Sequence, residues 1–353
     1  MNTKFLKTIA KASIENYSEL LHKIPFSSYN HISAQSKKDF KDVLDVWMPE
    51  TGPGTQVVRW NITQWCNYNC PYCPQDHGRF AKYGNYTAHA FDNYPLDQWI
   101  SSFKRHFEKK HLSLVITGGE PLLDVVNMRV FLRELTAMPT VECIRLDTNA
   151  SWKPEKYVDL DLSKIILMCT FHPSQVSTEA FFDHIERLKE VGFNIGMVNF
   201  VMDHTNIKLY KDIRVRMNKA GIPLHPNPLW DAQGMYSEED LRILKEELPE
   251  VDFLHRTRKS STFGKKCLFP ALAYQMTFDG NIHIGCHGNF AGSFFDEKLP
   301  DLFAGPVPCP AKSCICLDMY SFLKDINRNT DTNPLKVYSG LLKEIRGIEE
   351  SAS

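Results

Sequence analysis

Short apolar runs alternate with amphipathic stretches along the middle of the chain. The apolar runs predict β-strands at 57–63, 112–117, 141–147, 164–171, 193–201 and 222–227. The stretches between them carry apolar residues at helical spacing and predict helices at 95–109, 125–137, 178–191 and 206–220. This repeated order predicts an α/β fold with a parallel sheet, in which polar residues that follow the strands gather at one edge.

The regions on either side of this repeat have a different pattern. Residues 237–248 predict a helix whose first turn is acidic, which suits the positive end of the helix dipole. Further on, Asp279-Gly280-Asn281 predicts a hairpin turn between short strands at 274–277 and 282–284. We therefore divide the chain into an N-terminal helical segment (1–50), a core barrel (51–235), a small extension (236–330) and a C-terminal helix or tail (331–353).

Composition and charge are those of an ordinary globular protein. Of 353 residues, 43% are hydrophobic and 24% are charged, and the formal net charge is −1. A chain so close to neutral lacks the broad basic surface of nucleic-acid binders, so we expect no nucleic-acid partner. No apolar run approaches the roughly 20 residues of a membrane span, and Lys4, Lys7 and Lys11 interrupt the N-terminus, unlike an export signal. These features predict a cytoplasmic protein with no membrane partner.

Three cysteines directly after the first predicted strand are the strongest chemical signal. Cys66, Cys70 and Cys73 have the spacing Cys-x3-Cys-x2-Cys. A cubane iron–sulfur cluster normally takes four cysteines, so three would leave one iron open to another ligand. The alternatives are a structural zinc site with His77 as its fourth ligand and disulfide bonds, which are less compatible with a chain of this length.

A glycine-rich element, Gly118-Gly119-Glu120-Pro121, follows the second predicted strand. Glycines let the main chain approach a polar ligand closely, so this element predicts a cofactor contact. Together with the cysteine triplet, which has Tyr72 before its last cysteine, the element resembles the signature of radical S-adenosylmethionine (SAM) enzymes. The resemblance covers roughly residues 56–230.

The resemblance implies a partial (βα)6 barrel, similar to part of a TIM barrel, and a specific use of these residues. In the family, three cysteines hold a [4Fe–4S] cluster whose open iron binds the amino and carboxylate groups of SAM. One electron, from an external donor such as flavodoxin or ferredoxin, then cleaves SAM to methionine and a 5′-deoxyadenosyl radical, which takes hydrogen from a substrate. Carried onto this chain, the resemblance implies SAM contacts from Tyr72, Gly118, Gly119, Glu120 and Pro121.

Polar residues at the ends of two later strands are further candidates for SAM binding. Asp147-Thr148-Asn149 resembles the Thr-Asn-Gly element of the family, with Ala150 in place of its glycine, and implies a ribose contact from Asn149. Thr170 and His172 end the fourth predicted strand and point to the same region. A purely structural role is the alternative for each of these residues.

The C-terminal part contains five more cysteines, in a pattern that resembles the SPASM or twitch extensions of radical SAM enzymes: Cys267, Cys286, Cys309, Cys314 and Cys316. A full SPASM pattern has seven cysteines, so five imply one auxiliary [4Fe–4S] cluster of the twitch type. Cys267 and Cys286 are the first two ligands in this interpretation, and two of the last three complete the set. A zinc ribbon is the alternative, because zinc also takes cysteines at short spacing.

These observations together predict a radical SAM oxidoreductase. The resemblance to twitch-type enzymes favours a carbohydrate-like substrate, a sugar or a cyclitol, with the auxiliary cluster accepting an electron. The alternatives are a peptide- or protein-modifying radical SAM enzyme and a non-catalytic iron–sulfur electron carrier. The sequence assigns no acid or base residue and does not identify the substrate, the fate of SAM or the oligomeric state.

Overall fold

The computed structural model describes residues 55–73, 82–83, 86–229, 236–247, 262–267, 269–285, 290–304 and 307–310. The predictions for residues 1–50 and 331–353 lie outside the described residues, as do those for His77, Cys286, Cys314 and Cys316.

A sheet of nine strands forms the centre of the described part. Six of its strands pair in parallel, in the order β1 (Gln56–Thr63), β4 (Leu112–Gly118), β5 (Val141–Thr148), β6 (Ile165–Phe171), β7 (Asn194–Met202) and β8 (Leu224–Pro228). These are the six predicted strands, each within two residues of its predicted bounds. The predicted α/β fold with a parallel central sheet is therefore confirmed.

Three further strands extend the sheet beyond β1. β10 (Ala273–Met276) pairs in parallel with β1, while β11 (Asn281–Ile284) and β12 (Phe290–Ser293) follow in antiparallel order. The predicted hairpin is thus confirmed as β10 and β11. It joins the same sheet as the core, because β1 has β4 on one side and β10 on the other.

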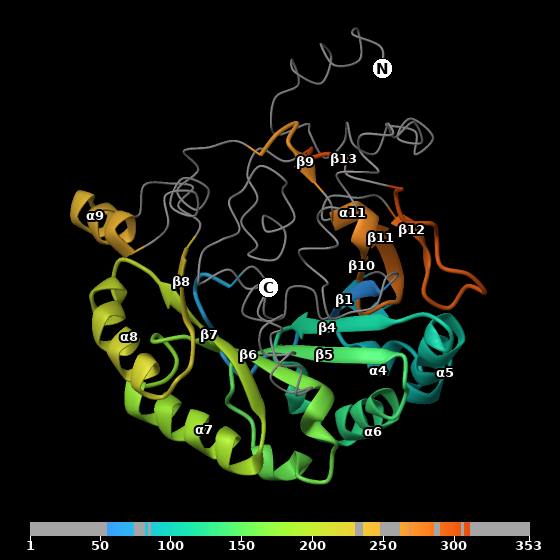
Figure 1. The fold of residues 1–353 in the computed structure, drawn as a ribbon, viewed down its shortest axis with the longest axis horizontal. Helices are drawn as coiled ribbons and strands as arrows, with labels where there is room; N and C mark the ends of the chain where they lie inside the picture. Colours follow the sequence, from blue (N-terminus) through green and yellow to red (C-terminus); the bar gives the residue numbers. More distant parts are fainter. Residues whose placement is uncertain are drawn as a thin grey trace, which may run out of the picture.

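The helices lie in an arc along the outer side of the sheet (Figure 1). The longer ones are α5 (Leu96–Phe107), α6 (Val125–Thr136), α7 (Thr178–Val191), α8 (Tyr210–Lys219) and α9 (Glu238–Glu247). The short ones are α4 (Ala90–Asn93), α11 (Phe269–Leu272), η3 (Pro121–Leu123), η4 (Pro154–Tyr157), η5 (Leu162–Lys164) and η6 (Ile207–Leu209). Two separate ladders pair β2 (Lys82–Tyr83) with β3 (Tyr86–Thr87) and β9 (Lys266–Cys267) with β13 (Val307–Pro308).

Local sequence explains where these helices start and stop. α7 begins after Ser177, whose hydroxyl accepts a hydrogen bond from the Ala180 N–H at 3.2 Å, and ends at Gly192, which has a φ of 100°.

Among the described helices, none is both long and apolar enough to cross a lipid bilayer.

The core lies between the outer face of the sheet and the helices. Along β1, Val58, Trp60 and Ile62 are buried in this core. Trp60 packs against Trp99 of α5, with ring centroids 4.6 Å apart. Each such fully buried side chain contributes about 1.5–3 kcal/mol through the removal of apolar surface from water. The residues between these positions point to the opposite, inner face of the sheet, where they are available to the candidate site.

Candidate active site

The cysteine triplet lies on a loop that begins where β1 ends, at the carboxyl edge of the parallel sheet. Cys70 is buried, Cys66 and Cys73 are partly exposed, and none of the three forms a disulfide. The loop ends in a turn in which the Cys73 N–H donates to the Cys70 carbonyl oxygen at 3.1 Å. This edge is where parallel α/β folds carry their sites, so the loop is placed as the sequence predicts.

The glycine-rich element at the end of β4 packs against the start of this loop. The Gly119 N–H donates to the Thr63 carbonyl oxygen at 2.7 Å, and the Glu120 N–H to the Trp65 carbonyl oxygen at 2.6 Å. A Cβ on Gly118 would overlap with the main chain of Thr63, and one on Gly119 with that of Trp65. The neighbour that requires glycine at these two positions is the cysteine loop itself, and the predicted contact of this element with a cofactor stays a prediction.

The Glu120 carboxylate joins the ends of β4 and β5. Its side chain is buried and accepts hydrogen bonds from the Thr148 hydroxyl at 2.9 Å, the Asn149 N–H at 2.6 Å and the Leu122 N–H at 3.2 Å. Burial raises the pKa of Glu120 to about 7, although these three donors act to lower it. Pro121 follows as the first residue of η3, a position that suits its fixed φ. The carboxylate is thus a brace between two strand ends, and its contact with SAM stays a prediction.

The segment after β5 contacts the first cysteine of the loop. The Asn149 side chain donates from Nδ2 to the Cys66 sulfur at 3.6 Å and to the Asn67 Oδ1 at 3.1 Å. The Asn67 amide in turn donates to the Ser151 hydroxyl at 2.8 Å. Ala150, the residue that replaces the glycine of the resembling motif, has a φ of 59°. A left-handed conformation at this position explains why glycine suits it.

The segment after β6 holds the far end of the loop. The Tyr72 hydroxyl lies 3.2 Å from Nδ1 of His172 and 3.3 Å from the Ser174 hydroxyl. The same His172 nitrogen is 3.6 Å from the Cys70 sulfur. Burial lowers the pKa of His172 to about 4, so its imidazole is neutral at physiological pH.

Gln175 makes a paired contact with the main chain of the loop. Its Oε1 accepts from the Asn69 N–H at 2.9 Å, and its Nε2 donates to the Asn69 carbonyl oxygen at 3.3 Å. The loop is therefore held by residues that follow β4, β5 and β6. The sequence analysis missed Gln175 and Ser174, and also Asn67 and Ser151. Their one signal is that they are polar and lie in or next to the turns that follow strands.

Burial and mutual proximity raise the pKa values of the loop thiols. The pKa of Cys70 rises to about 11, first because of burial and then because of the charge on Cys73. Burial likewise raises the pKa of Cys66, while the Tyr68 N–H, 3.4 Å from its sulfur, lowers it. Three thiols that affect one another in this way suit a metal cluster, since metal binding replaces their protons.

A single metal ion is a different case. Within the described ranges, no group of three or more His, Cys, Asp or Glu residues is arranged to hold one ion. A [4Fe–4S] cluster is several atoms wide, so its thiolate ligands stand farther apart than the ligands of one ion. The donor set of the loop, three thiols on eight residues of chain, fits a cluster that takes thiolate ligands.

The inner face of the sheet next to the loop is polar. Arg59 of β1, Val115 of β4 and Arg145 of β5 lie in one row across three adjacent strands. Arg145 is buried and binds Asp147 through two hydrogen bonds, of 2.9 and 3.1 Å. This face was not predicted from the sequence, although the alternation of polar residues along β1 and β5 could have indicated it.

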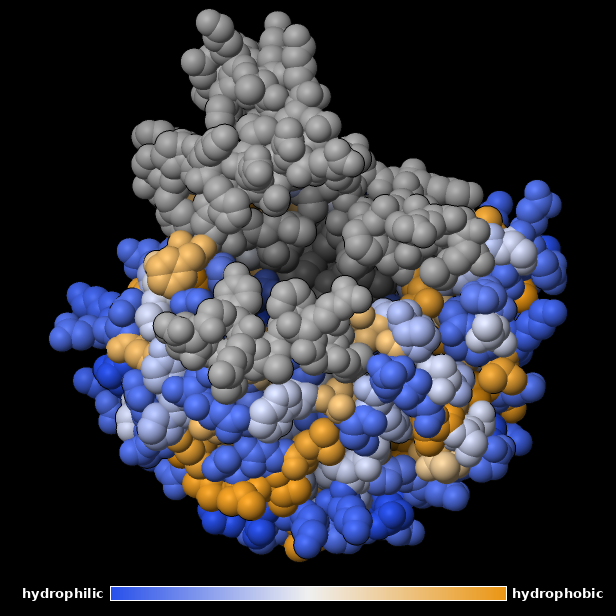
Figure 2. Space-filling model, turned by 180° about the vertical axis from the view of Figure 1, so that it is seen from behind, coloured by the Kyte–Doolittle hydropathy of each residue, from blue (hydrophilic) through white to orange (hydrophobic). Residues whose placement is uncertain are grey.

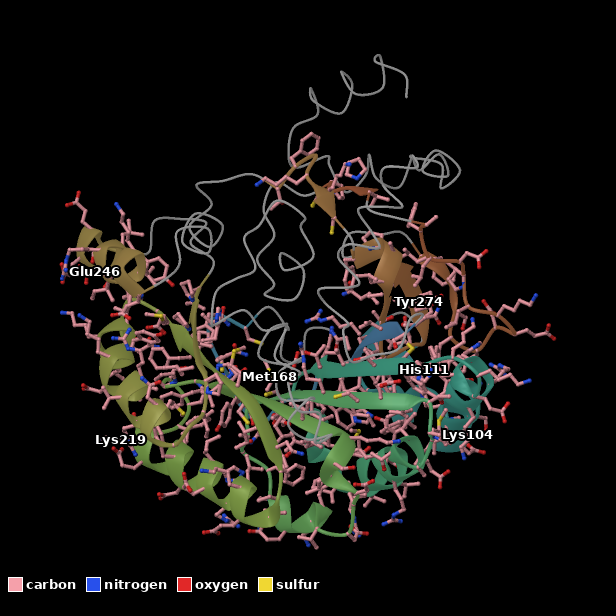
Figure 3. The ribbon with its side chains drawn as sticks, in the orientation of Figure 1. Lys104, His111, Met168, Lys219, Glu246 and Tyr274 are labelled. Atoms are coloured by element: carbon pink, nitrogen blue, oxygen red, sulfur yellow. The ribbon has the colours of Figure 1, made fainter. Side chains whose placement is uncertain are left out.

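A second polar row crosses the next three strands. Thr170 of β6, predicted to contact SAM, lies opposite Asn199 of β7, and Asn199 lies opposite His225 of β8. Figure 3 labels Met168, which comes from the same side of β6 and lies towards the hollow of the sheet, whereas Lys104 and Lys219 extend outwards from the helices. Arginine, carboxylate, amide and imidazole groups on one face suit a polar, hydroxylated ligand.

Two of the C-terminal cysteines lie together in the described part. β9 and β13 pair Cys267 with Val307, and Cys309 follows two residues later, on the same face of the ladder as Val307. The Cys309 N–H donates to the Lys265 carbonyl oxygen at 2.7 Å. Both cysteines are buried, and neither forms a disulfide. The ladder thus brings together two of the five predicted auxiliary ligands.

Comparison with known proteins agrees with this geometry. Residues 60–222 match the Radical SAM superfamily. A GTP 3′,8-cyclase of Listeria monocytogenes serotype 4b (strain CLIP80459) is 29% identical over 159 residues, which are 41% of this chain and 45% of the cyclase. A GTP 3′,8-cyclase of Listeria welshimeri serovar 6b is 26% identical over a match of the same length. The match thus spans less than half the length of these curated relatives.

A solved structure has the same fold. Native anSMEcpe with bound AdoMet is 13% identical in sequence, and the comparison covers 69% of this chain and 78% of that chain with a TM-score of 0.50. Residues 60–222 are therefore similar to a radical SAM domain, a family whose members use SAM and a [4Fe–4S] cluster.

Proposed function

We propose that the chain is a radical SAM oxidoreductase that acts on a sugar or a cyclitol. It would cleave SAM reductively and use the 5′-deoxyadenosyl radical to remove hydrogen from its substrate. The observation that carries this proposal is the cysteine loop, held at the carboxyl edge of a parallel sheet by residues that follow β4, β5 and β6. A thiol loop fixed on three sides suits a cofactor that must stay in place while its ligand reacts.

Cys66, Cys70 and Cys73 would hold the [4Fe–4S] cluster, which supplies one electron when bound. The other residues position these thiolates. Asn149 Nδ2 and the Tyr68 N–H donate towards the Cys66 sulfur, and such donors stabilise a thiolate.

Several residues border the place where SAM would bind. The main chain of Tyr72 and the side chains of Asn149 and His172 all lie on or against the cysteine loop. Thr170 lies two residues before His172 on the same strand end. We propose these residues, with the main chain of Gly118, Gly119, Glu120 and Pro121, as the SAM contacts.

The polar inner face supports a polar substrate. Arg59, Arg145 and Asp147 lie next to the loop on β1 and β5, where they could bind hydroxyl groups. The matched cyclases carry a name that gives GTP as their substrate, and this also favours a polar small molecule. Oxidation of an alcohol removes a hydrogen atom, a proton and one electron. An auxiliary cluster held by Cys267, Cys286 and two of Cys309, Cys314 and Cys316 would accept that electron.

The test is product formation by the reconstituted protein. Anaerobically reconstituted protein, reduced with dithionite, is given SAM and assayed for 5′-deoxyadenosine. The proposal predicts its formation, and deuterium from a substrate labelled at its reacting carbon should appear in it. No 5′-deoxyadenosine from fully loaded protein would favour a non-catalytic electron carrier. Cleavage that is stimulated by a precursor peptide, but by no sugar or cyclitol, would move the protein to the peptide-modifying class.

A further inference from the structure

A small apolar patch lies on the outer surface, close in structure to the cysteine loop. We define it by four exposed aliphatic side chains: Leu123 in η3, Val126 and Val130 on α6, and Val158 directly after η4. Val126 is 76% exposed and Val158 is 62% exposed. Figure 2 shows hydrophobic residues gathered in a band over this part of the outer surface. An exposed apolar patch of this kind marks a binding surface more often than a scattered single residue does.

Two contacts join the segments that carry the patch. The Tyr157 hydroxyl donates to the Leu122 carbonyl oxygen at 3.0 Å, which places the residue before Val158 against the residue before Leu123. Arg129, next to Val130, donates to Asp159 at 2.7 Å, which places the residue after Val158 against α6. The three segments that carry the four side chains are therefore adjacent.

The patch reaches the cysteine loop through a short chain of contacts. The Leu123 N–H donates to the Glu120 carbonyl oxygen at 3.4 Å, and the Glu120 N–H donates to the carbonyl oxygen of Trp65, the residue before Cys66. The Trp65 side chain is itself 48% exposed. A protein bound on the patch would thus lie next to the loop that carries the three cysteines.

The rim of the patch has an excess of positive charge. Arg129 and Arg133 share one carboxylate, that of Asp159. Lys153 and Lys156, at the start and in the middle of the η4 segment, are exposed and have no acidic partner among the described residues. The remaining acidic residue of that segment, Glu155, is paired with Arg187. Such a rim attracts an acidic partner.

We propose that this patch and its basic rim are the docking surface for an acidic one-electron carrier protein of the flavodoxin type. This inference rests on the proposed function, since SAM cleavage needs one electron from outside the protein. The reduced carrier gives up one electron and is itself oxidised by one. That electron breaks the bond between C5′ and the sulfonium sulfur of SAM, which yields neutral methionine and the 5′-deoxyadenosyl radical. A patch of four side chains suits a transient encounter, because electron-transfer interfaces lie at the small end, below about 1,200 Å².

The experiment compares two reductants in matched variants. Val126→Asp places a charge in the patch, and the double variant Lys153→Glu/Lys156→Glu reverses the rim. Val215→Asp on α8 is the control, because Val215 is also an exposed helical valine, with 53% exposure. Each protein is assayed for 5′-deoxyadenosine with reduced flavodoxin and, separately, with dithionite.

We expect both patch variants to lose at least about fivefold in flavodoxin-driven rate at low ionic strength and limiting flavodoxin. Their dithionite-driven rates and both rates of Val215→Asp should equal those of the wild type. The loss in the lysine variant should shrink as salt is added, because screening weakens charge attraction at the surface.

Three results would overturn the proposal. The first is an unchanged flavodoxin-driven rate in both patch variants. The second is an equal loss with both reductants in folded variants, which would place the effect on turnover itself and not on electron delivery by flavodoxin. The third is a wild-type dimer that Val126→Asp converts to a monomer with no change in the flavodoxin-driven rate, which would assign the patch to a second copy of the chain.

A failure of the proposed function gives a different result. In that case the wild-type protein forms no 5′-deoxyadenosine with dithionite. Binding of oxidised flavodoxin, followed by quenching of its flavin fluorescence, then tests the surface without turnover. Binding that Val126→Asp weakens and Val215→Asp does not would support the docking surface. Equal binding by both variants would overturn it.

Discussion

The chain holds its two groups of described cysteines in different ways. Cys66, Cys70 and Cys73 lie on a loop whose main chain and side chains are bound by residues after three neighbouring strands. Cys267 and Cys309 are held by a two-stranded ladder that fixes them relative to each other. The first group is held by three separate segments, whereas the second is contacted by its ladder and by the turn before β9, where Thr262 and Gly264 contact Cys309. We therefore expect the first region to depend on packing as well as on its thiols, and the second mainly on its thiols.

The largest effect should come from the thiols of the loop. Replacing Cys66, Cys70 or Cys73 with Ala removes one of three cluster ligands and should abolish SAM cleavage. Cys143→Ala is the matched control, because Cys143 is a buried cysteine on β5 that forms no disulfide and is not part of the loop. Formation of 5′-deoxyadenosine measures the outcome. Full cleavage by any of the three loop variants would refute the assignment of these ligands.

A change that touches no thiol should also disturb the loop. In Gly119→Ala the new Cβ would overlap with the main chain of Trp65, so the loop or β4 must shift. We expect a loss of about 1–3 kcal/mol in the free energy of unfolding, measured in urea, together with a lower iron content. Gly292→Ala on β12 is the control, since its Cβ would overlap with no main-chain atom and would come nearest to the end of the Asp296 side chain, at 3.3 Å. Similar behaviour of the two variants would show that the packing against Trp65 does not shape the site.

Substitutions in the second cysteine group should lower the iron content of the protein without affecting SAM cleavage. Cys267→Ala or Cys309→Ala should remove about four irons per chain, one [4Fe–4S] cluster, and leave SAM cleavage by the loop intact. Iron and zinc analysis of the purified variants, with a 5′-deoxyadenosine assay, measures both. Unchanged iron with loss of zinc would identify a zinc ribbon instead, and loss of SAM cleavage would join the two regions into one site.

The smallest effect should be a gain in stability next to the loop. Ala150 has a φ of 59° and is buried, and glycine adopts this conformation without the strain of a Cβ. We expect Ala150→Gly to stabilise the protein by about 0.5–1 kcal/mol in urea unfolding, with no loss of iron. A clear loss of stability would mean that the Ala150 methyl group contributes more through packing than its conformation costs.

The sequence predicts the frame of this molecule well, because its signals are local. Short apolar runs predicted β1, β4, β5, β6, β7 and β8, and the spacing of three cysteines predicted the loop. The pairing of β10 with β1 joins residues more than two hundred positions apart, and no local pattern indicates it.

The contacts that hold the cysteine loop could not be predicted from local sequence patterns either, because they join residues far apart in the chain. Gly118 and Gly119 predicted a close main-chain approach, but only the register between β1 and β4 shows that Thr63 and Trp65 are the neighbours. Gln175 has no motif, and its role depends on where the segment after β6 lies. The apolar spacing of α6 predicts a buried face, whereas Val126 belongs to the exposed one.

The paramagnetic resonance spectrum of the loop cluster tests most directly whether SAM binds a cluster held by Cys66, Cys70 and Cys73. Anaerobically reconstituted Cys267→Ala protein, which should keep only the cluster at Cys66, Cys70 and Cys73, is reduced, and its spectrum is recorded before and after SAM is added. We expect SAM to change the g values of the signal, because SAM would bind directly to the iron that no cysteine holds. An identical spectrum with saturating SAM would contradict it.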